Sequence, residues 1–306
     1  KAMTILSIII LLLIIAGLIH KRVKAGARKI QANPSPYSFE TLNQEPIGDE
    51  VFILREDGTR IRAVSKGEGP TVILAHGYGV SLQVWNVIWD LLLHAGYRVI
   101  AFDQRGHGKS TIGSEGIGSQ QMAGDYRAVL EHFDVRDALL VGHSMGGFLA
   151  TVLLLTDPQF AAQRLKGFVL FASTAGNILE GAPQNRIQVP LLKLGILQKL
   201  SESDTYGWGF GASLYGDTPS PAGIKALNQL FATQHHEKLV PVIEALAKEH
   251  YYPRLGEIQL PCAVVCGNKD KATPIWHSKK LGQGIPGAHN IWVDGKGHML
   301  NWEAPE

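Results

Sequence analysis

The feature that most constrains the fold of this chain is an apolar run that breaks into Gly-His-Ser-Met-Gly at residues 142–146. A serine on a sharp turn between a strand and a helix is a nucleophile elbow, and the turn is too tight for side chains two residues before and after the serine. Gly142 and Gly146 fit because glycine has no Cβ. The pattern predicts an elbow with Ser144 at its tip. A purely structural Gly-Ser-Gly turn is the alternative.

Short apolar runs alternate with amphipathic helical segments along most of the chain, which predicts an α/β fold with a mostly parallel central sheet flanked by helices. An Asp57-Gly58 turn indicates that the first two strands form a hairpin. Strands are predicted at Val51–Arg55, Arg60–Ser65, Thr71–Ala75, Arg98–Phe102, Asp137–Val141, Gly167–Ala172, Cys262–Gly267 and Asn290–Val293, and helices at Leu82–Ala95, Gln120–Phe133 and Phe148–Thr156.

The alternation of strand and helix stops at Ser173 and resumes at Cys262. The residues between are rich in helix formers, prolines and aromatics, and they are too many for an ordinary loop. We therefore expect a helical cap insertion at 175–257, above an α/β core formed by 49–174 and 258–306. A further helix is expected after His298, and we expect it to be truncated at Glu306.

A strongly apolar segment, Thr4–Ile19, lies near the beginning of the chain. As a helix it spans about 24 Å, and flanking basic side chains can extend its reach across a bilayer. The alternative is a cleaved signal peptide with a small-residue site at Ala25-Gly26-Ala27. We predict a single-pass membrane helix with a basic juxtamembrane part at 1–32, then a polar linker at 33–48. Which side of the membrane carries the core, and whether the segment forms a homodimer, stay open.

Charge and cysteine content restrict the partners of the chain. A net charge of +2 predicts no nucleic-acid partner. Cys262 and Cys266 lie four residues apart in a predicted strand, about 13 Å in an extended chain, so they cannot form a disulfide with each other. We expect both to be buried apolar residues.

A serine hydroxyl becomes a useful nucleophile only beside a base that a third group orients. In elbow enzymes the acid and the histidine follow the serine in that order. Asp270 follows the strand that ends at Gly267, and His298 follows the last strand, so both lie at the carboxyl edge of the sheet with Ser144. The sequence predicts a catalytic triad of Ser144, Asp270 and His298.

Each of these assignments has a simpler alternative. Asp270 could cap a helix that begins near Pro274-Ile275, and His298 could be a solvated loop residue. We expect the remaining histidines to be structural or exposed, with His235 and His236 on the surface of the cap. The spacing of potential ligands predicts no metal site, and no glycine pattern predicts a nucleotide, so we expect no cofactor.

The oxyanion of an acyl-transfer intermediate needs backbone donors near the serine. The residue after the nucleophile supplies one, which is Met145 here. The loop after the third predicted strand supplies the other, and in His76-Gly77-Tyr78-Gly79 we expect Tyr78 to donate it.

With these motifs and the segment Asp103-Gln104-Arg105-Gly106-His107-Gly108-Lys109-Ser110, the chain from about residue 50 to residue 306 resembles an α/β-hydrolase-fold serine hydrolase. The resemblance implies that the Asp-x-Arg-Gly turn is structural. The apolar N-terminus and the cap make the chain similar to bacterial membrane-anchored lipases, phospholipases and esterases of this fold.

This resemblance implies a membrane-anchored ester hydrolase that acts on acyl lipids, namely a monoacylglycerol, a lysophospholipid or a phospholipid, with the lipid bilayer as its partner. Serine at the elbow argues against epoxide hydrolases and haloalkane dehalogenases. It does not exclude thioesterases, carbon–carbon hydrolases, lactonases or perhydrolases. A non-catalytic membrane-tethered binding or scaffold subunit is the alternative from another class.

Overall fold

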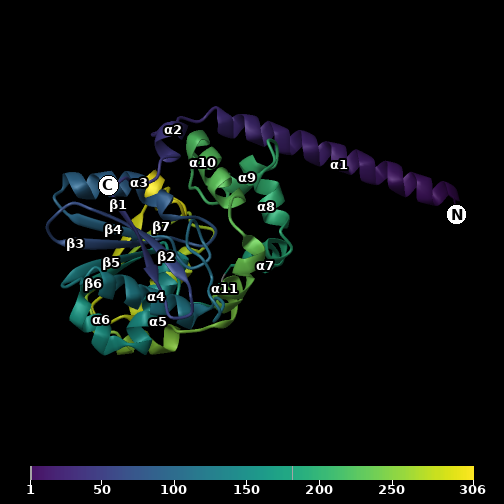
Figure 1. Ribbon diagram of the computed structural model, residues 1–306. Coiled ribbons are helices and arrows are strands. Elements are labelled where there is room, and N and C mark those ends of the chain that lie inside the picture. Colours follow the sequence, from purple (N-terminus) through teal and green to yellow (C-terminus); the bar gives the residue numbers. More distant parts are fainter. Residues whose placement is uncertain (1, 181) are drawn as a thin grey trace.

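A computed structural model describes residues 2–180 and 182–306, and within the first helix the side chains of Leu11 and of Leu13 onward. Strands of the described part form one eight-stranded sheet in the order β1-β2-β4-β3-β5-β6-β7-β8 (Figure 1). The strands are β1 Asp49–Leu54, β2 Arg60–Lys66, β3 Thr71–Ala75, β4 Arg98–Phe102, β5 Ala138–His143, β6 Leu165–Phe171, β7 Cys262–Gly267 and β8 His289–Val293.

The sheet is mostly parallel, as predicted. β1 pairs with β2, and β2 with β4, in antiparallel register, whereas the neighbours from β4 to β8 are all parallel. The carboxyl ends of the parallel strands therefore meet at one edge, where the loops after β3, β5, β7 and β8 emerge.

Apolar layers cover both faces of the sheet. One face packs against α4, α5, α6 and α12, and the other against a 3₁₀ turn, α3 and α13. Residues of α5 from Met145 to Leu155 are all buried, which explains why this segment is apolar on every side. These helices are α3 Asn86–His94, α4 Ser119–His132, α5 Met145–Thr156, α6 Pro158–Arg164, α12 Ile275–Gly284 and α13 Leu300–Glu303, with the 3₁₀ turn at Leu82–Trp85.

Between β6 and β7, in the region predicted to form a cap, the described chain forms helices and no named strand. Figure 1 shows them as a layer beside the sheet, in green shades. They are α7 Asn185–Lys193, α8 Ile196–Ser201, α9 Gly207–Ala212, α10 Pro221–Ala232 and α11 His236–Lys248, followed by a 3₁₀ segment at Tyr252–Glu257.

The chain begins with the long helix α1, Ala2–Gln31, whose first half extends past the body of the molecule (Figure 1). Its second half packs on the cap helix α9, with His20 Nδ1 3.2 Å from the Tyr206 hydroxyl. In half of the predicted span Thr4–Ile19, namely residues 4–10 and 12, the side chains lie outside the described part. Among the residues that are described, no helix meets the length and hydropathy needed to cross a bilayer.

The segment predicted as a polar linker at 33–48 is partly ordered against the rest of the molecule. This segment contains α2, Phe39–Leu42, and Leu42 is buried. The Asn33 side chain donates to the Pro219 carbonyl (3.0 Å), and the Asn86 side chain donates to the Thr41 carbonyl (2.9 Å). These hydrogen bonds join the segment to parts of the chain far away in sequence, so the segment docks on the cap and on α3.

Candidate active site

Ser144 lies in the strained turn that the sequence predicted, with φ 54° and ψ −118° between β5 and α5. A Cβ on Gly142 would come within 2.5 Å of the Gly147 backbone, and one on Gly146 would overlap the carbonyl oxygen of Ala75. A non-glycine residue at this φ costs about 1–3 kcal/mol, which the packing of β5 and α5 offsets. The serine is partly exposed, so its hydroxyl is accessible.

Asp270 and His298 are brought together at the same edge of the sheet. His298 Nδ1 lies 2.8 Å from Asp270 Oδ2, and both residues are buried, at 6% and 5% exposure. A proton on Nδ1 directed at the carboxylate leaves Nε2 as the acceptor. The histidine is therefore held in the tautomer that a general base requires.

Asp270 does not cap α12, the role considered as its alternative, because the N-cap residue of α12 is Pro274 and no side chain caps that helix. Its Oδ1 accepts hydrogen bonds from the backbone amides of Ala272 (2.8 Å) and Thr273 (2.9 Å), in the turn that precedes α12. One oxygen is thus fixed by the backbone while the other faces His298.

Thr273 is a site residue that the sequence reasoning missed. Its hydroxyl lies 2.9 Å from Asp270 Oδ2 and 3.3 Å from His298 Nδ1. The Asp-x-x-Thr spacing typical of side-chain-capped turns is the signal that would have indicated it.

The two predicted oxyanion donors belong to the segments next to the serine. Met145 is the first residue of α5, so its amide has no acceptor within the helix. Tyr78 follows Gly77, whose Cβ, if present, would lie 3.2 Å from the Ser144 Cβ. The loop after β3 therefore passes directly beside the nucleophile.

Three other histidines near the serine are buried and structural. Burial lowers the pKa of His76 to about 4 and that of His143 to about 3, and it holds the pKa of His107 well below its ordinary value. His143 Nε2 lies 3.0 Å from the backbone carbonyl of His298, so the neutral ring donates to the loop that carries His298.

The surface position predicted for His236 was wrong, whereas His235 is exposed as expected. His236 is 2% exposed, and its ring lies 4.0 Å from that of Phe231 and 5.7 Å from that of Tyr78. The position of His236 within the predicted cap does not reveal that its side chain is buried. The residue begins α11, and the inner face of that helix covers the loop after β3.

The Asp-x-Arg segment is structural, as the resemblance implied. Asp103 is fully buried and accepts from the amides of Leu82 (2.8 Å) and Lys109 (2.9 Å). Arg105 makes a two-point ion pair with Asp125, both contacts at 2.8 Å. Their polar atoms are engaged in holding loops, so neither side chain is available for chemistry.

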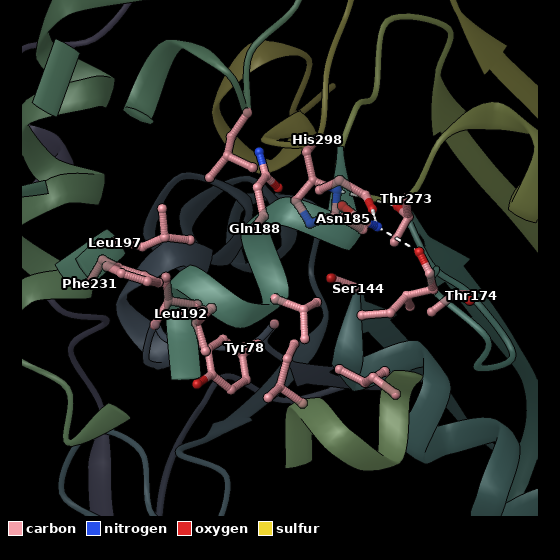
Figure 2. Close-up of a pocket in the computed structure, with 18 of the residues that line it drawn as sticks. Tyr78, Ser144, Thr174, Asn185, Gln188, Leu192, Leu197, Phe231, Thr273 and His298 are labelled. Atoms are coloured by element: carbon pink, nitrogen blue, oxygen red, sulfur yellow. Dashed lines mark hydrogen bonds between the residues drawn. The ribbon is translucent and has the colours of Figure 1, made fainter. Parts of the chain in front are cut away.

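Ser144 and His298 line one cavity of about 150 Å³ between the sheet edge and the cap (Figure 2). Its lining contains no Asp, Glu, Lys or Arg among the described residues. All five cap helices contribute apolar side chains to the wall: Val189, Leu192, Leu197, Phe210, Leu227, Phe231, Ile243 and Leu246.

A strained serine elbow, a later aspartate–histidine pair and a sheet in this strand order define an α/β hydrolase fold. The chain belongs to the alpha/beta hydrolase fold family, whose model matches residues 70–305. The family predicted from the motifs is therefore confirmed at the level of the fold.

Relatives of the chain include enzymes that are named for different reactions. It is 30% identical over 252 residues to a non-heme chloroperoxidase from Kitasatospora aureofaciens, covering 80% of this chain and 90% of that protein. It is also 30% identical over 270 residues to a 2-hydroxy-6-oxononadienedioate/2-hydroxy-6-oxononatrienedioate hydrolase from Cupriavidus pinatubonensis, covering 84% and 91%.

Among solved structures, an esterase from Exiguobacterium antarcticum matches with a TM-score of 0.72 at 23% identity, over 84% of this chain and 94% of the esterase. At this identity the likeness shows the shared fold alone.

Proposed function

We propose that this chain is a serine hydrolase that cleaves carboxylic esters with an apolar acyl group. One observation carries the proposal: a mainly apolar cavity holds Ser144 beside His298, whose tautomer is set by buried Asp270. This arrangement provides a nucleophile, a base and a binding site for hydrocarbon in one place.

In the proposed mechanism, His298 Nε2 takes the Ser144 proton as the hydroxyl oxygen attacks the ester carbonyl. Asp270 stabilises the imidazolium that forms. The amides of Met145 and Tyr78 donate hydrogen bonds to the developing oxyanion. The imidazolium then protonates the leaving alcohol, and an acyl-enzyme remains on Ser144.

Deacylation repeats these steps with water. His298 removes a proton from the attacking water, the second tetrahedral intermediate uses the same two amides, and the carboxylic acid leaves as Ser144 regains its proton. Each step is a proton transfer or an acyl transfer, so the proposed reaction requires no redox partner.

Lipid esters are the substrate class that we favour. The cap side chains form a hydrocarbon surface suited to an acyl chain, as found in monoacylglycerols, lysophospholipids and phospholipids. Each CH₂ group transferred from water into such a site contributes about 0.8 kcal/mol, so longer acyl chains should bind more tightly until the cavity is full.

Carbon–carbon bond hydrolysis is the second candidate, because a relative at 30% identity is named for a dienedioate substrate. A dioate carries two carboxylates, and burying a carboxylate without a cationic partner is costly. The described residues that line the cavity include neither lysine nor arginine. This lack of a cationic partner favours an uncharged ester.

We further propose that α1 anchors the enzyme in a membrane. Large apolar side chains in its described part are 43–66% exposed, and basic residues follow them. A contiguous apolar surface of this kind is typical of a membrane contact. These exposed residues are Leu11, Leu13, Ile14, Ile15, Leu18 and Ile19.

A substrate panel tests the proposed activity. Purified enzyme and a Ser144→Ala variant are assayed on p-nitrophenyl esters of increasing acyl length, monoacylglycerol, lysophospholipid, an acyl thioester and a dienedioate. We expect Ser144-dependent ester hydrolysis that rises with acyl length. Cleavage of the dienedioate with no ester hydrolysis would favour the second candidate and contradict the proposal.

A further inference from the structure

Two amide side chains face the mainly apolar cavity from the cap. Asn185 and Gln188 lie three residues apart on α7 and therefore on one face of that helix. Both line the cavity that holds Ser144 and His298. Figure 2 shows the two amides on the side of the cavity where His298 lies.

Asn185 is 5% exposed and held in one orientation. Its Nδ2 donates to the carbonyl oxygens of Ile178 (2.7 Å) and Ala272 (3.0 Å), which uses both amide hydrogens. The side-chain oxygen is left as a hydrogen-bond acceptor at the wall of the cavity.

Gln188 has no such restraint. Its side chain is half-buried and makes no hydrogen bond within the described part of the chain. A half-buried amide without a partner loses part of its hydration, so a ligand that supplies both a donor and an acceptor gains from binding there. Together the two residues offer one donor group and two acceptors.

The other side of the cavity is hydrocarbon. In Figure 2, Leu192, Leu197 and Phe231 lie together at the left of the cavity, whereas Asn185 and Ser144 lie toward its right. An ester bound at Ser144 has an acyl part and an alcohol part that point in different directions. Because His298 protonates the leaving alcohol, that part must lie on the His298 side, which is the side of the amides.

We propose that Asn185 and Gln188 form a subsite for an uncharged, hydroxyl-bearing alcohol group, such as the glycerol part of a monoacylglycerol. A hydroxyl both donates and accepts, and so it matches the amide set. A phosphate in this subsite would have no cation among the described lining residues. The inference rests on the proposed ester hydrolysis. Among the three lipid classes proposed as substrates, it selects the uncharged one, the monoacylglycerols.

The test compares two esters of one fatty acid, its 1-monoacylglycerol and its methyl ester, presented in the same detergent micelles. The variants are Gln188→Leu, which removes the amide, and Gln188→Glu, which keeps the size but removes the donor. Gln229→Leu is the matched control, since Gln229 is exposed on α10 and does not line the cavity. The measured quantity is the ratio of kcat/KM for the glyceryl ester to that for the methyl ester.

We expect both Gln188 variants to lower this ratio about five- to tenfold, the effect of one neutral hydrogen bond, and Gln229→Leu to leave both rates unchanged. An unchanged ratio in the Gln188 variants would overturn the subsite while leaving ester hydrolysis intact. Wild-type enzyme that cleaves neither ester would overturn the proposed function itself, and the subsite with it.

Discussion

Replacing Asp270 by asparagine should abolish most activity without unfolding the protein. The backbone amides of Ala272 and Thr273 both donate to Asp270 Oδ1, so the oxygen of the new amide must take that position. Its NH₂ group is then directed at His298 Nδ1, where the carboxylate oxygen lay at 2.8 Å. The ring must accept this hydrogen bond at Nδ1 and carry its own proton on Nε2.

A His298 ring protonated on Nε2 cannot remove the Ser144 proton. The loss expected for a wrong tautomer of this kind is about 10⁴-fold in kcat, or about 5 kcal/mol of transition-state stabilisation. Because the two backbone hydrogen bonds survive, the midpoint of thermal unfolding should move by only a few degrees.

The assay is steady-state hydrolysis of a p-nitrophenyl ester at pH 7.5, with circular dichroism to follow unfolding. Asp90→Asn is the matched control, since Asp90 is exposed on α3 and away from the sheet edge, and it should retain full activity. A loss of less than tenfold in Asp270→Asn would refute the role assigned to the aspartate.

Three further predictions concern the scaffold and the anchor. Gly146→Ala should give little soluble protein on expression, because the new Cβ meets the carbonyl oxygen of Ala75; wild-type yield would contradict the close packing of the elbow. The free energy of unfolding should have its full value above pH 6.5 and should decrease as the pH drops toward 3. The reason is that His143 has a pKa of about 3 when folded and takes up a proton near pH 6.5 once unfolded. His143→Gln should flatten that fall in denaturant titrations, and an equally steep fall would exclude His143 as its source. Deleting residues 1–19 should abolish sedimentation with lipid vesicles yet retain p-nitrophenyl esterase activity, since the part of α1 that packs on α9 is kept. Continued sedimentation would argue against the anchor.

The sheet was predictable because its strands are encoded locally. Thr71–Ala75, Arg98–Phe102 and Cys262–Gly267 have the predicted bounds, since each is a short apolar run bordered by turn residues. The order of Ser144, Asp270 and His298 along the chain, each just after a strand, predicted that they lie at one edge of the sheet. In the structure the Asp270 carboxylate lies 2.8 Å from His298, and Ser144 lines the same cavity as His298.

The contacts of the cap were not predictable in the same way. Burial of His236 depends on Tyr78 and Phe231, and the docking of residues 33–48 depends on hydrogen bonds to partners far along the chain. The position of Asn185 and Gln188 at the cavity was not predictable from the sequence either, because the sequence of a helix does not show which of its faces covers a cavity.

Active-site labelling tests the central claim most directly. The intact chain is treated with a fluorophosphonate, which modifies activated serines, and the labelled peptide is identified by mass spectrometry. We predict one modification, on Ser144, that is absent in Ser144→Ala and strongly slowed in His298→Ala. An intact, folded wild-type chain that stays unlabelled, or one labelled at another residue, would contradict the assignment of Ser144 as the nucleophile.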